Sequence, residues 1–404
     1  MPNPSLLIVP ARFKTGRLYS QIPSNTDNRG DFNVTRATAA TRVNSAGLIE
    51  SVASGIPRLD YFASGGVVGC PALLVEPAAT NLVLQSEAFN TTWALVTGGT
   101  GSLPSVTANA VISPDGTQNA ETILLNRGAG NTITDQSTLQ QSITLATSGT
   151  YIFSVYAKAT ASGDVGKQIF LRAGGAGSLI AYTLTANWVR LTRTETGLAS
   201  GSNVFQIGNR GTVTADNSVS VDLWGAQLET GSIATSYIPT TTAPVTRNAD
   251  VISVSGAVSG SIGQTEGTIY AEFTNTLVAS YVEGYMYRVF ADANNEIWAR
   301  KEGGTNTYSF RWRANSQNTT FLNVAVPNGV NKIAFGYKSG DTALFLNGSQ
   351  VATTNTDVRA FSVNPTTIAL GSTSSGQFFN DRIRAAALYT TRLTNAQLAA
   401  LTTP

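Results

Sequence analysis

Histidine is absent from this chain of 404 residues, and cysteine occurs once, at Cys70. Without histidine the chain cannot build a Ser-His-Asp triad or a Cys-His dyad, and it lacks the commonest ligand for metals. A single cysteine excludes an intrachain disulfide framework, so stability must come from packing or assembly. We interpret Cys70, which precedes Pro71, as a small buried hydrophobic residue.

Charged residues are scarce as well, at 12% of the chain, and the net charge is +2. The 26 basic residues are scattered, which leaves no electrostatic footprint for nucleic acid or for an anionic membrane. The first ten residues contain an apolar run of only four residues before Pro10, which predicts neither a signal peptide nor a membrane span. We therefore expect no nucleic-acid partner and no membrane insertion.

Glycine, serine, threonine, asparagine and alanine are abundant, and hydrophobic residues make up 42% of the chain. This neutral composition is typical of β-rich extracellular or virion proteins and not of long-helix proteins. A length of 404 residues exceeds one ordinary core and predicts two domains plus a smaller segment.

Residues 1–80 are rich in turn-forming and basic residues between short apolar runs. Too few apolar residues recur at a fixed period to make a core, so we expect a few strands that depend on another chain or on the next domain for burial.

Residues 81–243 show short alternating strands separated by turn residues. Tyr151, Phe153 and Val155 share one face, and Val219, Val221 and Leu223 share another before Trp224 and Gly225 break the rhythm as a bulge does. This spacing predicts a β-sandwich whose tryptophans, Trp93, Trp188 and Trp224, belong to the core. The order of segments 80–90, 139–145 and 149–158 with these tryptophans resembles the carbohydrate-binding-module jelly rolls of phage proteins and polysaccharide-degrading enzymes.

Residues 250–404 form a second alternating region after a Thr/Pro connector. Ile269, Ala271 and Phe273 are expected inward, Asn347 and Gly348 give a strong hairpin signal, and 393–401 is expected to form a short helix that starts near Thr394 or Asn395. The order of these features resembles the concanavalin A-like, laminin-G-type lectin sandwich. The fold class expected for the whole chain is all-β, with two tandem β-sandwiches or jelly rolls after a small N-terminal attachment segment.

Several further segments resemble a recurrent layout of tailed-bacteriophage virion proteins: 6–19, 43–50, 57–61, 222–240 and 245–250. This resemblance implies location in a virion assembled in the bacterial cytoplasm, with residues 1–80 as the attachment end. Phe13, Tyr19, Arg36 and Arg42 are the candidate contacts with tail or capsid proteins. A fibre would be expected to form a homotrimer, although no heptad stretch imposes one.

The sequence was searched for catalytic and metal signatures. Glycoside hydrolases need two carboxylates across the scissile bond, and the hydrolase branch of the concanavalin-like fold places them as Glu-x-Asp-x-x-Glu, a run that does not occur here. Glu266, Glu272, Glu283, Asp292 and Glu296 are not spaced to share a strand face in that way. We expect no catalytic residue, no cofactor and no metal; the loop aspartates match no calcium signature.

Binding is the function that remains, and aromatic or planar cationic side chains are typical of sugar contacts. In 308–313, Phe310 and Trp312 are expected in the core, while Arg311 and Arg313 point the other way, either as a solvated face or as a patch for acidic glycan or a neighbouring subunit. Trp298, before Arg300, is either core or a stacking platform.

The function predicted from the sequence is a non-enzymatic phage fibre or spike that displays lectin-like domains to host-surface polysaccharide. Two alternatives remain open at this point. The protein could be a capsid decoration protein that reinforces the shell, or a glycan-active enzyme carrying binding modules.

Overall fold

Short alternating segments make almost every element of this chain a strand. The structure is a computed structural model that describes residues 1–23, 30–62, 69–175, 178–256, 258–276, 283–305, 307–354, 360–373 and 376–404. Within these ranges lie 31 strands, two 3-10 turns, η1 (Ser162–Asp164) and η2 (Ser259–Ser261), and one α-helix, α1 (Asn395–Thr402). The all-β fold class is confirmed.

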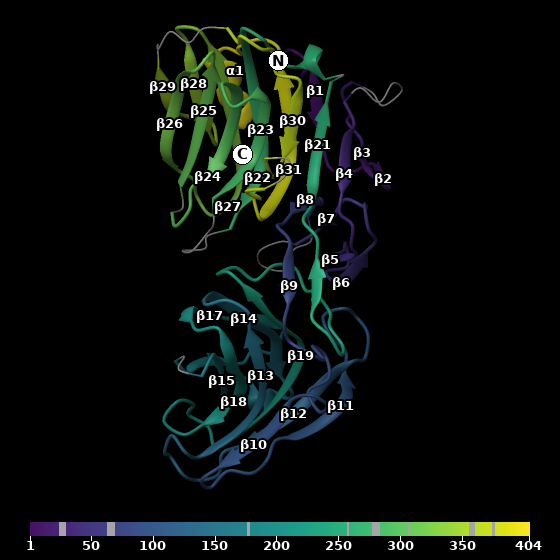
Figure 1. The fold of residues 1–404 in the computed structure, drawn as a ribbon, viewed down its shortest axis with the longest axis vertical. Coiled ribbons are helices and arrows are strands. Elements are labelled where there is room, and N and C mark those ends of the chain that lie inside the picture. The colour runs from purple at the N-terminus through teal and green to yellow at the C-terminus, as the bar shows by residue number, and fades with distance from the viewer. Residues whose placement is uncertain are drawn as a thin grey trace. The chain divides into compact units, whose positions relative to one another are not determined.

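The chain divides into two compact units, each described separately below. The central unit contains Leu48–Glu50 and Ala79–Arg247, coloured mainly blue and teal in Figure 1. The terminal unit contains Met1–Gly47, Ser51–Ala78 and Asn248–Pro404, and thus carries both ends of the chain.

The central unit is a sandwich of two five-stranded antiparallel sheets. One sheet has the order β10 (Ala94–Gly98), β13 (Gln136–Leu145), β18 (Gly201–Arg210), β15 (Gln168–Ala173), β16 (Ile180–Thr183). The other has the order β11 (Ser105–Val111), β12 (Ala120–Asn126), β19 (Ser218–Thr230), β14 (Gly149–Ala159), β17 (Val189–Leu198). A two-stranded ribbon of β9 (Ala79–Asn81) and β20 (Val245–Arg247) brings the two ends of the unit together.

The core of the central unit lies between its two sheets. The expected inward residues Phe153, Val155, Val221 and Leu223 are all buried there, and Trp93 joins them. Trp224 is buried too, but with Tyr237 on the opposite face of β19, because it follows the inward-pointing Leu223. The predicted bulge is present next to Gly225, whose φ is +65°, and it returns Ala226 and Leu228 to the core face.

Trp188 is only partly buried, and it packs against the Trp224 cluster rather than in the core. Lys158 lies over its ring at 5.2 Å. The core placement expected for Trp188 from its strand pattern is therefore wrong.

The terminal unit is a larger antiparallel sandwich. Its first sheet runs β29 (Ser349–Thr354), β28 (Thr342–Leu346), β27 (Gly329–Lys338), β22 (Glu266–Asn275), β31 (Asp381–Tyr389), β8 (Ala72–Val75), β7 (Leu59–Asp60), and β1 (Leu6–Ile8) also pairs with β31. Its second sheet runs β2 (Phe13–Lys14), β3 (Arg17–Leu18), β4 (Phe32–Thr35), β21 (Val251–Ser255), β30 (Thr367–Leu370), β23 (Gly284–Asp292), β24 (Asn295–Lys301), β25 (Thr307–Ala314), β26 (Gln317–Ala325). Two further short strands are β5 (Ala40–Val43) and β6 (Ile49–Val52).

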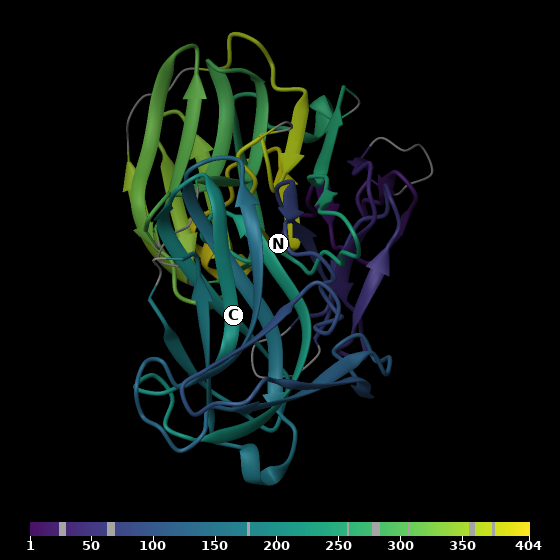
Figure 2. The same ribbon diagram turned by 60° about the horizontal axis from the view of Figure 1, so that its bottom comes forward.

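The N-terminal strands lie within these two sheets. Strand β4 pairs with β21, as both ribbon views show by a purple strand beside a teal one (Figures 1 and 2), while β8 and β1 pair with β31. Leu6, Phe32 and Leu73 are buried in the same core as Ile269 and Phe273. From the sequence we expected residues 1–80 to be a segment separate from residues 250–404. In the structure most of both ranges belong to one unit, and the C-terminal sandwich supplies the burial that the N-terminal strands need.

Local sequence signals account for the ends of several elements in this unit. Asn347 and Gly348 have φ of +48° and +84° and connect β28 to β29, as a two-residue hairpin requires. Thr394 caps α1 by accepting a hydrogen bond from the Gln397 backbone N–H, and the Gln397 side chain accepts one from Thr394. Leu398 of this helix packs on Tyr270, on the face of β22 opposite the core. The hairpin and helix predictions are confirmed.

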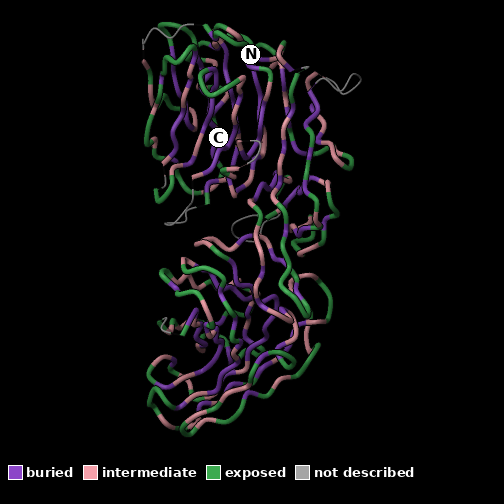
Figure 3. Tube along the Cα trace, viewed as in Figure 1, coloured by how far each residue is buried: buried purple, intermediate pink, exposed green. Residues whose placement is uncertain are grey.

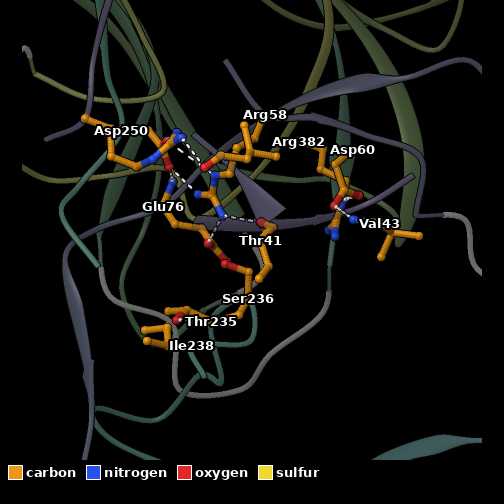
Figure 4. A network of polar contacts seen from close by, with 12 residues as sticks. Thr41, Val43, Arg58, Asp60, Glu76, Thr235, Ser236, Ile238, Asp250 and Arg382 are labelled. Atoms are coloured by element: carbon orange, nitrogen blue, oxygen red, sulfur yellow. Dashed lines mark hydrogen bonds and ion pairs between the residues drawn. The ribbon is translucent and has the colours of Figure 1, made fainter. Parts of the chain in front are cut away.

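A buried cluster of ion pairs connects the N-terminal strands to the start of β21 (Figure 4). Arg58 forms ion pairs with Glu76, at 2.6 Å, and with Asp250, and it donates a hydrogen bond to the Thr41 carbonyl. Arg36 pairs with the same Asp250 at 2.8 Å. Burial alone would lower the pKa of Arg58, but the charges of Asp250 and Glu76 outweigh it and raise that pKa, so the guanidinium stays ionised.

Burial follows the strands closely in both units, as Figure 3 shows by the purple stretches along them. Cys70 is an exception to our expectation, because it is exposed. It lies just before β8 begins, and the core positions there are filled by Leu73 and Val75.

In the described part of the chain, no helix is long and apolar enough to cross a membrane.

Candidate functional site

The outer face of the β10-β13-β18-β15-β16 sheet carries amide, hydroxyl and guanidinium side chains on its three central strands. Because side chains alternate along a strand, the residues between the core positions point away from the sandwich. The strand register aligns them in rows: Gln140, Gln206 and Arg172 form one row, and Thr138, Gly208 and Phe170 form the next. We call the polar face the surface formed by Gln136, Thr138, Gln140, Phe170, Arg172, Gln206, Gly208 and Arg210.

The first row of the polar face is joined by hydrogen bonds. The Gln206 amide donates to Gln140 Oε1 at 2.8 Å, and Arg172 donates to Gln206 Oε1 at 3.4 Å. The amide and guanidinium planes are thereby oriented across three neighbouring strands. Gln206 is only 4% exposed, so the planar groups of this row that a sugar could reach are those of the half-buried Gln140 and Arg172.

The next rows contain the aromatic residue of the face. Phe170 is fully buried, and the guanidinium of Arg210 lies over its ring at 5.6 Å. Gly208 lies opposite both Thr138 and Phe170 and has no side chain to rise above the middle of the sheet. A Cβ at this position would come within 2.5 Å of Thr138 Cγ2. The flat surface that a ligand would meet here is therefore the guanidinium of Arg210 and not the ring beneath it.

A hollow of about 490 Å³ continues the polar face at its β10 edge. The hollow exists because β10 begins only at Ala94, which pairs with Gln140. Strand β13 continues from there to Leu145 without a neighbouring strand on that side. Gln140 is common to the hollow and the first row. The lining is mixed, with leucines and a proline facing the glutamines and hydroxyls of β13: Leu82, Leu84, Thr92, Ala94, Gln140, Gln141, Ser142, Ile143, Thr144 and Pro244.

Several polar atoms of the polar face are shielded from water and have no hydrogen-bond partner. They are Gln136 Oε1, Thr138 Oγ1, Arg172 Nε and Arg210 Nε. Arg190 and Arg193 on the other sheet have the same kind of buried, unpartnered Nε, so these atoms are a general feature of the central unit and do not distinguish this face.

The residues that the sequence singled out for glycan binding lie on the terminal unit. Trp298 and Arg311 are register partners on β24 and β25, and Arg313 lies in the next row, opposite Glu296. All three point away from the core, which instead takes Phe310 and Trp312, as predicted. The structure therefore does bring Trp298, Arg311 and Arg313 onto one face.

Trp298 is nevertheless only 3% exposed, although it lies outside the main core. Arg300 and Arg311 cover its ring at 5.0 and 5.6 Å, and Tyr285 packs against its edge at 5.6 Å. The ring is thus stacked on the protein's own guanidinium groups, and a sugar would have to displace one of them. Neither of the two placements that the sequence allowed, core or open platform, describes it.

The arginines around Trp298 are neutralised by nearby carboxylates. Arg300 pairs with Glu283 at 2.9 Å and with Glu302 at 3.0 Å, and Arg311 approaches Glu296 at 3.9 Å. Arg313 donates to the Ala293 carbonyl at 2.8 Å. These carboxylates serve as ion-pair partners, and this face offers a ligand little uncompensated charge.

The four candidate attachment residues are dispersed over the N-terminal strands. Phe13 is half-buried against the core, and Tyr19 is half-buried with Lys14 near its ring. Arg42 is half-buried, whereas Arg36 is 2% exposed and paired with Asp250. Arg36 is therefore placed to stabilise the fold, and another protein could reach it only by breaking that pair.

Potential metal ligands do not cluster in the described residues. Within those ranges there is no group of three or more His, Cys, Asp or Glu side chains that could hold a metal ion. Among the carboxylates considered from the sequence, Glu272 pairs with Arg384 at 2.8 Å and Glu296 with Arg288 at 2.7 Å.

Sequence reasoning missed the polar face. Its glutamines and arginines come from three strands far apart in the sequence, and no short motif contains them. The one available signal was alternation, because Gln140 and Gln206 stand next to the apolar residues Leu139, Phe205 and Ile207 of their strands.

The chain matches no family model and no curated protein. Among solved structures it is similar to the CBM40 of the Ruminococcus gnavus IT-sialidase bound to α2,3-sialyllactose, with 18% identity over 36% of this chain and 87% of that chain, at a TM-score of 0.32. It is also similar to domain 4 of AbnA, a GH43 extracellular arabinanase from Geobacillus stearothermophilus in complex with arabinotriose, with 15% identity over 42% and 82%, at a TM-score of 0.33.

A longer match is the tandem CBM22-1-CBM22-2 domain of Paenibacillus barcinonensis Xyn10C, with 12% identity over 79% of this chain and 100% of that chain, at a TM-score of 0.28. The β-sandwich fold of each unit follows from the strand pairings described above.

Proposed function

We propose that this chain is a non-enzymatic glycan-binding protein of a tailed-phage particle, which uses the polar face of its central unit to adhere to host-surface polysaccharide. The observation that carries the proposal is the hydrogen-bonded row Gln140–Gln206–Arg172 beside a hollow lined by Gln140. Amide and guanidinium planes on a rigid sheet suit a ligand that presents many hydroxyls and a few apolar patches.

The shallow shape of the site predicts weak binding by each copy. A face of this kind leaves much of a bound sugar chain in water, so affinity must be multiplied by display of many copies. Linked sites can raise avidity by about 10² to 10⁴ without any new contact. A homotrimeric fibre would provide such multiplication, and adhesion needs reversible contacts of this strength.

The virion location rests on the segments that resemble phage virion proteins. We propose that residues 1–80 contact tail or capsid proteins through their accessible parts, with Phe13, Tyr19 and Arg42 as the candidate residues. Arg36 acts indirectly in this proposal, by holding the N-terminal strands in place through Asp250.

Glycan binding is tested by microarray and calorimetry with the full chain and with the double variant Gln140→Ala/Gln206→Ala. We expect the intact chain to bind a restricted set of polysaccharides and the variant to lose about tenfold or more in affinity, since two hydrogen-bonding side chains are removed. Gln118→Ala is the matched control, because Gln118 belongs to the same unit and its amide bonds only the Asn109 carbonyl on the exposed β11–β12 hairpin. Equal binding by all three proteins would reject the polar face.

Location is tested by cryo-electron microscopy of the intact particle. Density at the tail or at a few projecting positions on the head would support adhesion. Hundreds of copies spread over the capsid lattice would indicate the decoration role instead. Release of reducing sugar from host polysaccharide by the purified chain would overturn the non-enzymatic assignment.

A further inference from the structure

We infer that the polar face selects acidic sugars, with Arg172 and Arg210 holding a carboxylate or another anionic substituent of the glycan. This inference rests on the proposed glycan-binding function and adds to it the chemical class of the ligand. Its basis is the uncompensated positive charge of the face, whereas Arg300 and Arg311 around Trp298 lie next to carboxylates.

The outward positions on the five strands of this sheet carry two arginines and no acidic residue. The strand registers assign these positions by pairing. They are Ala94, Val96, Gly98, Gln136, Thr138, Gln140, Ser142, Thr144, Gln168, Phe170, Arg172, Ala181, Thr183, Ser202, Val204, Gln206, Gly208 and Arg210.

Neither arginine of the polar face has a carboxylate partner in the described part of the chain. The side chain of Arg172 bonds Gln206, and that of Arg210 lies on the Phe170 ring. Asp135 precedes Gln136, but its two oxygens already accept hydrogen bonds from Thr100 and Thr132. The terminal unit behaves differently, because Arg288 and Arg384 each pair with a glutamate on a neighbouring strand, and Arg300 pairs with Glu283 just before β23.

The two guanidinium groups also affect each other. Partial burial and, after it, the positive charge of Arg172 lower the pKa of Arg210. Placing two like charges on a half-buried surface without a counter-ion costs free energy, and an anion bound between them would recover it.

Neutral parts of the face complement such a ligand. Gln136 lies opposite Arg210 and is half-buried, and its amide can bond sugar hydroxyls beside the guanidinium group; Thr138 lies in the row between the two arginine rows. An acidic sugar unit presents an anion together with hydroxyl donors, whereas an inorganic anion presents no such donors. The combination therefore favours a uronic or sialic acid type of unit over a bare phosphate or sulfate.

The test measures binding of the full chain to four acidic polysaccharides and to the same polymers after their carboxyl groups have been activated with a carbodiimide and reduced to alcohols with borohydride. The probes are polygalacturonate, alginate, hyaluronate and polysialic acid, with dextran sulfate as a polyanion that lacks sugar carboxylates. We expect at least one acidic polymer to bind, its reduced form to bind about tenfold or more weakly, and binding to weaken as salt rises.

Variants locate the effect on the polar face. Arg172→Gln and Arg210→Gln keep polar side chains, and each is expected to weaken acidic binding by about tenfold while the thermal midpoint shows that the chain is folded. Arg193→Gln is the matched control in the same unit, because Arg193 lies on the other sheet and pairs with Glu195 at 2.5 Å. Arg311→Gln tests the face of the terminal unit.

The outcomes separate the two proposals. Equal binding of acidic and reduced polymers would overturn the acidic preference and leave glycan binding standing. Binding of dextran sulfate as strong as that of every carboxylated polymer would reject sugar recognition in favour of a general anion surface. Absence of binding to all acidic and reduced polymers would overturn the inference, and absence of binding across the glycan microarray as well would overturn the proposed function.

Discussion

Arg58 and Asp250 lie 192 positions apart in the sequence and form an ion pair that is almost completely shielded from water. Asp250 stands just before β21, which enters the C-terminal sandwich, and Arg58 stands just before β7 of the N-terminal segment. Asp250 also forms an ion pair with Arg36 and accepts a hydrogen bond from the Glu76 backbone N–H. One carboxylate thus ties together three points of the N-terminal segment and the first strand of the C-terminal sandwich.

We predict that Asp250→Asn lowers the free energy of unfolding of the terminal unit by about 3–5 kcal/mol, because the change leaves two buried guanidinium groups without their shared counter-ion. Denaturant unfolding followed by tryptophan fluorescence measures it. The matched control is Asp341→Asn, which removes an ion pair with Arg392 whose aspartate side chain is 56% exposed, and which we expect to cost about 1 kcal/mol or less. Equal losses in the two variants would contradict a stabilising role for the buried cluster.

The elements of the fold were largely predictable because they depend on local sequence. Alternation placed Ile269, Ala271 and Phe273 in the core, and Asn347 with Gly348 gave the hairpin. Assignment of the N-terminal strands to particular sheets was not predictable, since it depends on pairings such as that of Leu6 with Leu388, which no local pattern specifies.

The candidate site was less predictable than the fold. The sequence placed Arg311 and Arg313 on one face and singled out Trp298 separately. In the structure Trp298 joins them, but the stacking of Arg311 on Trp298 and the nearby glutamates take up the groups that a ligand would use. The polar face depends on the lateral register of β13, β18 and β15, which places Gln140, Gln206 and Arg172 in one row. Register between distant strands is a property of the folded sheet and cannot be read from the strands one at a time.

We predict that residues 250–404 produced alone do not fold, whereas residues 79–247 produced alone do. The isolated C-terminal part would lose β1, β4, β7 and β8 and would expose the core surface that Leu6, Phe32 and Leu73 cover. The central range keeps both of its sheets and its own core. Near-ultraviolet circular dichroism and resistance to protease measure both chains. A folded 250–404 chain would show that the N-terminal strands are accessory.

We predict that Asp135 stabilises the central unit at neutral pH and loses this effect in acid. Hydrogen bonds, first from the Thr132 side chain and then from the Thr100 and Thr132 backbone N–H groups, hold the pKa of Asp135 well below its ordinary value of 3.8. A carboxylate whose pKa is lower in the folded state stabilises the fold above the unfolded-state pKa, and that stabilisation disappears as pH falls from there through the folded-state value.

Thermal unfolding of the intact chain and of Asp135→Asn between pH 7 and pH 2 tests this sign. The difference between their midpoints should be constant from neutral pH to about pH 5 and should shrink below about pH 4. A difference that grows on acidification would contradict the prediction. A difference that does not change with pH would mean that the hydrogen-bond geometry, and not the charge, is what the loop requires.

We predict that Thr394→Ala lowers the free energy of unfolding of the terminal unit by about 1 kcal/mol, because the substitution removes the side-chain oxygen that caps α1. The helix covers Tyr270 and Tyr389 through Leu398, so fraying of its first turn would also loosen the packing on that face of the sheet. Denaturant unfolding measures the loss, and Thr394→Ser should restore most of it, since serine keeps the accepting oxygen. Thr391→Ala, three residues earlier at an exposed position, is the control and should change stability by no more than about 0.5 kcal/mol. If serine fails to restore what alanine removes, the stabilisation comes from the threonine methyl group and not from the cap.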